Sequence, residues 1–482
     1  MGDVHATWNR SLSFWKRKRR KGTMILLIVL LSTLLLAPAN LLESEEPTVP
    51  PQPSLTTPQE SILEERKQVF QFGTEGEILE LLKTLKEQKD RTLVENVLSL
   101  LDGKVSLKLT RGIFDFLQTL QWIDPRSEGY AVKLLQAPEE LDQETILTLL
   151  QYLSLPESKP HLEEVLPLLK DSRRRIVTAA VRYLGKKGNE EVVTKLIDLF
   201  KGQEAEEDLR TAILTALGEL KAPNAVAFLR SILDNPDERI VYRRFACDAL
   251  GKIGLAEAYP SIKKALEESD NLLRAYAVSA LGSYREEEVE TILLQALRDD
   301  FARVRASAAE QLGKRNSRSA VEMLMYRVRR DSDKQVRLSS LRALSEIGDE
   351  KSFSFLQELL LDEKASLDLR VETIRLFLQN PSEKGMKAIR TLLEREWAKE
   401  NSRLLDEACK QLSLQTVAGN GDLYQKMLSH RSFIIRIYGI RGIGRNNIQE
   451  ATDQLRQLAK EGASPQERKE ARLVLEQWGK SP

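Results

Sequence analysis

Arginine side chains recur at intervals of 31 to 33 residues, or twice that between Arg370 and Arg436. The column comprises Arg210, Arg243, Arg274, Arg305, Arg337, Arg370, Arg436 and Arg468. Acidic residues stand shortly ahead of several of these arginines, at Asp237, Asp270, Asp300 and Asp331. A guanidinium group binds a carboxylate through two parallel hydrogen bonds. The spacing therefore predicts a structural ladder in which an arginine of one repeat binds a carboxylate of the next.

A groove that binds anionic ligands is the alternative for the same arginines. The regular spacing favours the ladder, because a binding site normally interrupts a repeated pattern.

Metal and nucleophile chemistry find little support in the sequence. The three histidines, His5, His161 and His430, are far apart and form no pair with ligand spacing. The glycines of residues 439–444 (GIRGIG) follow no predicted strand, which argues against a phosphate loop. No serine-centred nucleophile motif is present. We therefore predict no catalytic residue, no metal site and no cofactor.

The two cysteines, Cys247 and Cys409, occupy the same register position five repeats apart. Helices in an array are spaced by ~8–10 Å, so the thiols lie too far apart for a disulfide. Their matching register predicts buried structural thiols, and a reactive thiol is the alternative.

Residues 430–445 (HRSFIIRIYGIRGIGR) form a basic stretch with four arginines, two aromatic residues and no acid. Such a stretch can contact an anionic surface. The ordinary interpretation is that this stretch forms one of the repeats.

Two columns of residues, spaced by four positions, predict the helices that hold these side chains. Apolar residues recur at Leu184, Leu217, Leu250, Leu281, Leu312, Leu344, Phe377, Leu412, Ile443 and Leu475. Four residues earlier, mostly small residues recur, such as Ala246, Ala277 and Ala308. Spacing by four puts both columns on one face of a helix. A glycine often follows the apolar column, and we expect it to end the helix as a C-terminal cap.

A second apolar column begins twelve residues after the first, as at Leu229, Ile262 and Leu293. It predicts a second amphipathic helix after the cap. Each repeat is thus an antiparallel helix pair, and stacked pairs bury their apolar faces against each other. We predict an all-α, right-handed α-solenoid of about a dozen helix pairs.

The strings at 300–313 (DFARVRASAAEQLG) and 331–344 resemble the HEAT-repeat family, in particular the HEAT-like repeats of the phycobilisome-lyase type. The resemblance is strong over 171–360 and fainter to Trp478. We assign 171–482 to a HEAT-like array and 61–170 to degenerate helical repeats. The resemblance implies an armadillo-like helical fold. It leaves function open, because HEAT arrays serve as scaffolds, adaptors and occasionally enzymes.

The first sixty residues have three parts. Residues 1–23 carry seven Lys/Arg and one Asp, whereas the rest of the chain carries 66 Lys/Arg and 71 Asp/Glu. An apolar segment, 24–42, follows the basic block, with a small-x-small pattern that predicts signal cleavage after Ala39. An uncut signal-anchor helix is the alternative. Residues 43–60 contain five prolines and predict an extended linker. Either way, the positive-inside rule places the repeats on the exported side of a membrane.

These features together predict a non-enzymatic scaffold or adaptor in the cell envelope, either secreted or membrane-anchored through 24–42. We expect its concave surface to bind a protein or peptide, with surface residues of the second helices involved, and we expect no nucleic-acid partner. A lyase or isomerase acting on a bilin, which the resemblance allows, is one alternative. A purely structural envelope protein is the other.

Overall fold

The computed structural model describes residues 58–202, 206–416 and 419–481. All regular secondary structure within these ranges is helical, with 26 α-helices and seven short 3-10 helices. The chain divides into two compact units, Met1–Ile62 and Leu63–Pro482, and only residues 58–62 of the first are described. The first helix, α1 (Pro58–Phe72), crosses that boundary.

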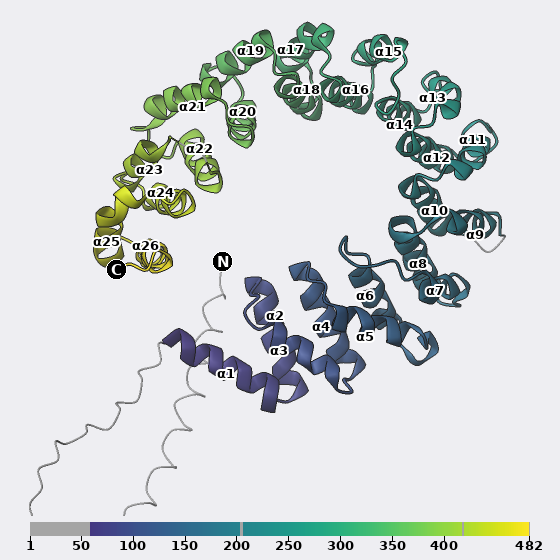
Figure 1. Ribbon diagram of the computed structural model, residues 1–482. Helices are drawn as coiled ribbons and strands as arrows, with labels where there is room; N and C mark the ends of the chain where they lie inside the picture. The colour runs from purple at the N-terminus through teal and green to yellow at the C-terminus, as the bar shows by residue number, and fades with distance from the viewer. Residues whose placement is uncertain (1–57, 203–205, 417–418, 482) are drawn as a thin grey trace, which may run out of the picture. The chain divides into compact units, whose positions relative to one another are not determined.

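In the second unit the even-numbered helices pack side by side in one continuous row (Figure 1). The row consists of α2 (Glu75–Gln88), α4 (Leu107–Leu120), α6 (Gln143–Leu153), α8 (Arg174–Lys187), α10 (Glu207–Leu220), α12 (Ile240–Ile253), α14 (Asn271–Leu281), α16 (Ala302–Lys314), α18 (Lys334–Ile347), α20 (Leu367–Gln379), α22 (Arg403–Leu414), α24 (Phe433–Arg445) and α26 (Pro465–Gln477). These helices carry the predicted first apolar column.

The odd-numbered helices from α3 onward form the second row. They are α3 (Val94–Ser99), α5 (Pro125–Leu135), α7 (Leu162–Val165), α9 (Glu190–Lys201), α11 (Val226–Leu233), α13 (Tyr259–Ala265), α15 (Glu288–Ala296), α17 (Val321–Arg330), α19 (Glu350–Leu361), α21 (Glu383–Glu396), α23 (Gly421–Leu428) and α25 (Thr452–Glu461). Twelve pairs, from α3–α4 to α25–α26, build the array, which confirms the predicted all-α solenoid of about a dozen pairs.

The helices pair differently from the prediction, which joined each even-numbered helix to the odd-numbered helix that follows it. Most odd-numbered helices pack chiefly on the even-numbered helix that follows, as α17 does on α18, and not on the one before. A short turn such as Asp331–Asp333 joins the two helices of a pair. The aspartate that precedes the arginine string therefore marks the turn within a pair.

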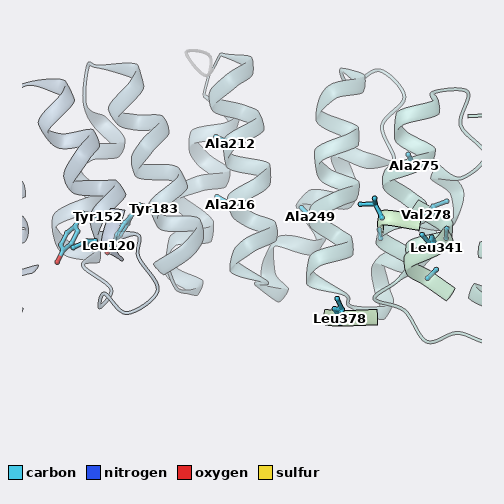
Figure 2. Close-up of a cluster of buried hydrophobic side chains, with 14 of the residues drawn as sticks. Leu120, Tyr152, Tyr183, Ala212, Ala216, Ala249, Ala275, Val278, Leu341 and Leu378 are labelled. Carbon is cyan, nitrogen blue, oxygen red and sulfur yellow. The ribbon is translucent and has the colours of Figure 1, made fainter. Parts of the chain in front are cut away.

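The glycines predicted as helix caps mostly lie inside helices, so that prediction was wrong. Helix α10 runs to Leu220 past Gly218, and α12 runs to Ile253 past Gly251. A Cβ at Gly218 would lie 2.7 Å from the Cα of Ala249 on the next even-numbered helix. Figure 2 shows Ala216 and Ala249 among the buried side chains of these helices. The glycine column permits close helix–helix contact, because a Cβ would collide with the neighbouring backbone.

This close packing belongs to the even-numbered row, which lies along the inner edge of the second unit in Figure 1. The odd-numbered helices, which are the predicted second helices, lie along the outer edge. The expectation that second helices supply the inner surface was therefore wrong, because the small residues that shorten the spacing sit on the first helices.

The row passes residue 170 without interruption, since α4 packs on α6 and α6 packs on α8. The apolar segment 24–42, Ala39 and residues 43–57 of the predicted linker lie outside the described residues. The linker prediction was wrong for its last three residues, 58–60, which form the start of α1. Within the described ranges, no helix is both long and apolar enough to cross a membrane.

Candidate protein-interaction surface

The arginine column lies where each even-numbered helix begins, beside the turns of the pairs. The Nε and Nη2 groups of Arg305 donate to Asp331 at 2.8 and 2.7 Å. Its Nη1 group donates to the backbone oxygens of Asp299 and Asp300, both at 2.9 Å. The Asp331 side chain is fully buried. Burial by itself raises the pKa of this carboxyl, but the hydrogen bonds and charges of Arg305 and Arg327 outweigh it and hold the pKa below its usual value.

Other members of the column bind a different acid from the one predicted. Arg274 binds Asp299, not Asp300, through two hydrogen bonds of 3.1 Å. Arg243 binds Glu268 at 2.5 Å. The predicted partner Asp270 instead accepts from Arg244, at 2.9 Å. The acids in contact, Glu268 and Asp299, stand in the turn of the next pair, two residues and one residue before the predicted aspartates.

Two further rungs involve glutamates, in the last part of the column. Arg436 forms a two-pronged contact with the fully buried Glu467. Arg370 lies 4.0 Å from Glu396 and also donates to the backbone oxygen of Leu360. These contacts place most of the column inside the array.

Arg210 and Arg337 contact no carboxylate among the described residues. Arg337 donates to the backbone oxygens of Asp331 and Ser332. Arg210 lies over the rings of Phe200 and Tyr242. Asp237 forms no ion pair with any described side chain, and the carboxylate of Asp300 forms none either.

Cys247 and Cys409 are both fully buried and free. Burial raises the pKa of each thiol well above its usual value. Such thiols stay protonated and are poor nucleophiles.

His161 and His430 lie outside the α-helices and do not approach one another. His161 faces Glu128, with 3.0 Å between Nε2 and Oε1, while His430 is buried against Trp397. No group of three or more His, Cys, Asp or Glu side chains suited to a metal ion occurs in the part of the chain that the structure describes.

A second set of ion pairs, which the sequence analysis missed, lies on the free face of the even-numbered row. This face is the side of each helix opposite the apolar column, at positions two, five and nine residues before it. Three pairs join neighbouring helices there: Arg342 with Glu372 at 2.7 Å, Arg375 with Glu407 at 2.6 Å and Arg441 with Glu470 at 2.6 Å. In each pair the cation is two residues, and the anion five residues, before the apolar column. That fixed register was visible in the sequence.

Two of these positions, five and nine residues before the apolar column, carry aromatic and apolar side chains on α12 and α14. Phe245 and Tyr276 stand five residues before the apolar column, with ring centroids 6.4 Å apart. Val241 and Leu272 stand nine residues before it, and all four side chains are half-buried. Arg303 of α16 lies over the Tyr276 ring at 5.6 Å. We call these five residues the central aromatic strip.

A hollow of about 550 Å³ lies between the starts of α22 and α24. It is lined by both charged and apolar residues, among them Arg403, Asp406, Arg431 and Ile434. Ile434 in its lining is 41% exposed, and the adjacent Phe433 is 44% exposed. The basic stretch 430–445 thus contributes to a mixed surface, and three of its arginines, Arg431, Arg436 and Arg441, are paired with glutamates.

The matches among solved structures have low identity to this chain and TM-scores below 0.5. The complex of CpcE and CpcF of phycocyanin lyase from Nostoc sp. PCC7120 is 19% identical, with a TM-score of 0.34, over 50% of this chain and 96% of that one. Importin beta is 14% identical, with a TM-score of 0.38, over 86% and 70%. Kap95p, solved with RanGDP, is 12% identical, with a TM-score of 0.41, over 86% and 60%. No curated protein matches the sequence.

The family comparison covers most of the array. The model described as "Spirochaete HEAT repeat protein" matches residues 70–474, a range that runs from the end of α1 into α26. The resemblance to HEAT repeats is thereby confirmed. The chain belongs to the Spirochaete HEAT repeat protein family.

Proposed function

We propose that this HEAT-repeat solenoid is a non-enzymatic scaffold, and that its protein partner binds the free face of the even-numbered helices at the central aromatic strip. The observation that supports this most strongly is the half-buried pair Phe245 and Tyr276, which share one register position on neighbouring helices. Aromatic and arginine side chains contribute disproportionately to binding at protein interfaces.

The strip contrasts with the rest of the free face. From α18 to α22 and at α24–α26, neighbouring helices neutralise each other's charges through ion pairs. Their polar groups already have partners, so a ligand gains little from them. At α12 and α14, apolar surface remains in contact with water, and its burial under a partner is favourable by roughly 25 cal/mol per Å².

The exported location is part of the same proposal. The basic block within 1–23 and the apolar segment 24–42 support export, with the linker 43–60 separating that segment from the repeats. An uncut segment would keep the array attached to the membrane, and cleavage after Ala39 would release it.

No specific observation supports the two alternative functions, a bilin enzyme and a purely structural protein. A bilin-attaching enzyme with a thiol nucleophile needs an accessible cysteine, whereas Cys247 and Cys409 are fully buried. A purely structural role would require no half-buried aromatic strip in contact with water.

The test is crosslinking in cells followed by affinity purification of the tagged full-length protein. The unmodified chain is compared with a Phe245→Ala, Tyr276→Ala double variant and with Tyr326→Ala, a matched change on the odd-numbered row. We expect recurrent envelope proteins whose recovery falls at least tenfold in the double variant, because the loss of even one aromatic anchor worth about 2 kcal/mol weakens binding about thirtyfold. Tyr326→Ala should leave recovery unchanged. Equal recovery from all three proteins, with melting temperatures unaltered, would contradict the proposal.

A further inference from the structure

We propose that Arg210 binds a carboxylate of the protein partner, supplied by an acidic segment, in a rung of the arginine column that no acid of the described residues fills. The inference rests on the proposed scaffold function and adds the chemistry of the partner. The site lies where α10 begins, and is separate from the central aromatic strip.

The unfilled rung is evident from the positions of the internal acids. In four rungs the acid stands 25 or 26 residues after its arginine: Arg243 with Glu268, Arg274 with Asp299, Arg305 with Asp331 and Arg370 with Glu396. The corresponding positions after Arg210 hold Asn235 and Pro236. Neither side chain carries a negative charge. Arg337 differs, because Asp362 and Glu363 occupy its corresponding positions.

The neighbouring side chains at the turn between α11 and α12 do not replace the missing acid. Asn235 uses its side-chain oxygen to accept the backbone N–H of Asp237, at 3.0 Å. Asp234 accepts a hydrogen bond from Ser261, at 2.8 Å. The local hydrogen bonds therefore hold this turn without Arg210.

The Arg210 side chain is held by aromatic rings instead. Its guanidinium carbon lies 5.4 Å from the Phe200 ring centre and 5.8 Å from that of Tyr242. Its Nε atom is buried and has no acceptor. One hydrogen bond, of 3.3 Å and at an exposed position, joins Nη2 to the backbone oxygen of Gly202. A guanidinium has five N–H donors, so Arg210 keeps donors free for a ligand.

The surroundings favour a carboxylate as that ligand. The rings fix the guanidinium plane, which lowers the conformational entropy that a bidentate contact would cost. Lys201 lies over the Phe228 ring at 5.9 Å, and Phe228 packs edge-on against Phe200. Lys201 thus adds a positive charge to this ring cluster, against the acidic Glu207 and Asp208 in the first turn of α10. Since Nε is covered, the carboxylate would bridge Nη1 and Nη2.

The test measures binding of a fluorescein-labelled peptide of alternating glutamate and glycine to the purified full-length chain, by fluorescence anisotropy. Matched peptides carry glutamine or phosphoserine in place of glutamate. We expect Arg210→Gln to weaken binding of the glutamate peptide about tenfold, and Arg210→Lys to weaken it less. Arg182→Gln removes the same charge from an exposed arginine of α8 and should have little effect.

A second variant keeps the proposal testable if Arg210→Gln fails to fold. Asn235→Asp supplies the missing acid within the chain, so it should raise the melting temperature and weaken binding of the glutamate peptide. Unchanged peptide binding in Asn235→Asp would overturn the proposal. An equal loss of glutamate-peptide binding in Arg182→Gln would also overturn it. So would an Arg210→Gln variant that loses binding of the phosphoserine peptide but keeps binding of the glutamate peptide.

Partner recovery separates this inference from the proposed function. If the Phe245→Ala, Tyr276→Ala variant loses its crosslinked partner while Arg210→Gln retains it, the scaffold proposal stands and the carboxylate site is wrong. If no partner recurs with the unmodified chain but the glutamate peptide still binds through Arg210, the scaffold proposal fails and the carboxylate site stands.

Discussion

Gly218 and Ala249 bring the backbones of α10 and α12 into contact, since a Cβ at Gly218 would lie 2.7 Å from the Ala249 Cα. A Cβ at Gly185 would likewise lie 2.7 Å from the Ala216 Cα, and a Cβ at Gly251 would lie 2.6 Å from the Ala280 Cα. Close backbone contact therefore recurs along the even-numbered row. It sets the spacing between successive pairs.

A Gly218→Ala substitution should destabilise the array by about 1–3 kcal/mol, because the added methyl group has no space between two packed helices. Gly129 of α5 is a matched control, since a Cβ there would meet nothing within 4 Å. Gly129→Ala should be neutral or stabilise by up to about 1 kcal/mol, through the higher helix propensity of alanine. Urea unfolding of both variants checks the difference. Equal effects at the two sites would show that the close contact has no energetic importance.

An Asp331→Ala substitution should destabilise by about 3 kcal/mol, because it leaves the Arg305 guanidinium buried without its partner. The exposed pair Arg175 and Glu144 is the control, with side chains 64% and 58% exposed. Glu144→Ala should cost under about 1 kcal/mol. Because repeats can unfold separately, hydrogen exchange of α16 and α18 is the appropriate measurement. A small loss of protection in Asp331→Ala would mean that the ladder contributes little.

Stability should fall in acid in a manner that depends on Asp331. Its pKa is lower in the folded chain than in the unfolded chain, where it is about 3.9. The stabilisation is therefore present above pH ~4 and is lost as the pH falls through the folded value. Asp331→Asn lacks this contribution, so the gap in melting temperature between the two proteins should narrow below pH ~4. A gap that stays constant would contradict the lowered pKa.

Both cysteines should react with a thiol reagent only when the array opens, because burial keeps the thiols protonated and covered. The folded chain should label slowly with Ellman's reagent at neutral pH, and the urea-unfolded chain should label both thiols at once. Rapid labelling of the folded chain would show that one thiol is accessible, and would reopen the possibility of a covalent function.

The columns of the sequence predict the helices well, because apolar spacing reports directly which side of a helix is buried. Leu250, Leu281 and Leu312 are fully buried, as their column requires. The phase of pairing was harder to derive. A glycine such as Gly218 suits both a helix end and a close helix contact, and only three-dimensional packing separates the two.

The arginine rungs show a second limit. The regular arginines were evident, but the partner of Arg274 is Asp299, next to the expected Asp300. Neighbouring residues point in different directions at a turn, so the reach of a side chain decides which acid pairs. The central aromatic strip had a sequence signal, since Phe245 and Tyr276 share one register position. Its contact with water depends on whether another helix covers that side of α12 and α14, which the register alone does not show.

The most direct test of the account is hydroxyl-radical footprinting of the full-length chain with and without its purified partner. Tyr276 lies in the central aromatic strip, and Tyr326 of α17 is 60% exposed on the odd-numbered row beside Arg327. The account predicts that the partner lowers oxidation of Tyr276 and Phe245 and leaves Tyr326 unchanged. Protection of Tyr326 with unchanged oxidation of Tyr276 would place the partner on the opposite row, and would contradict the central claim.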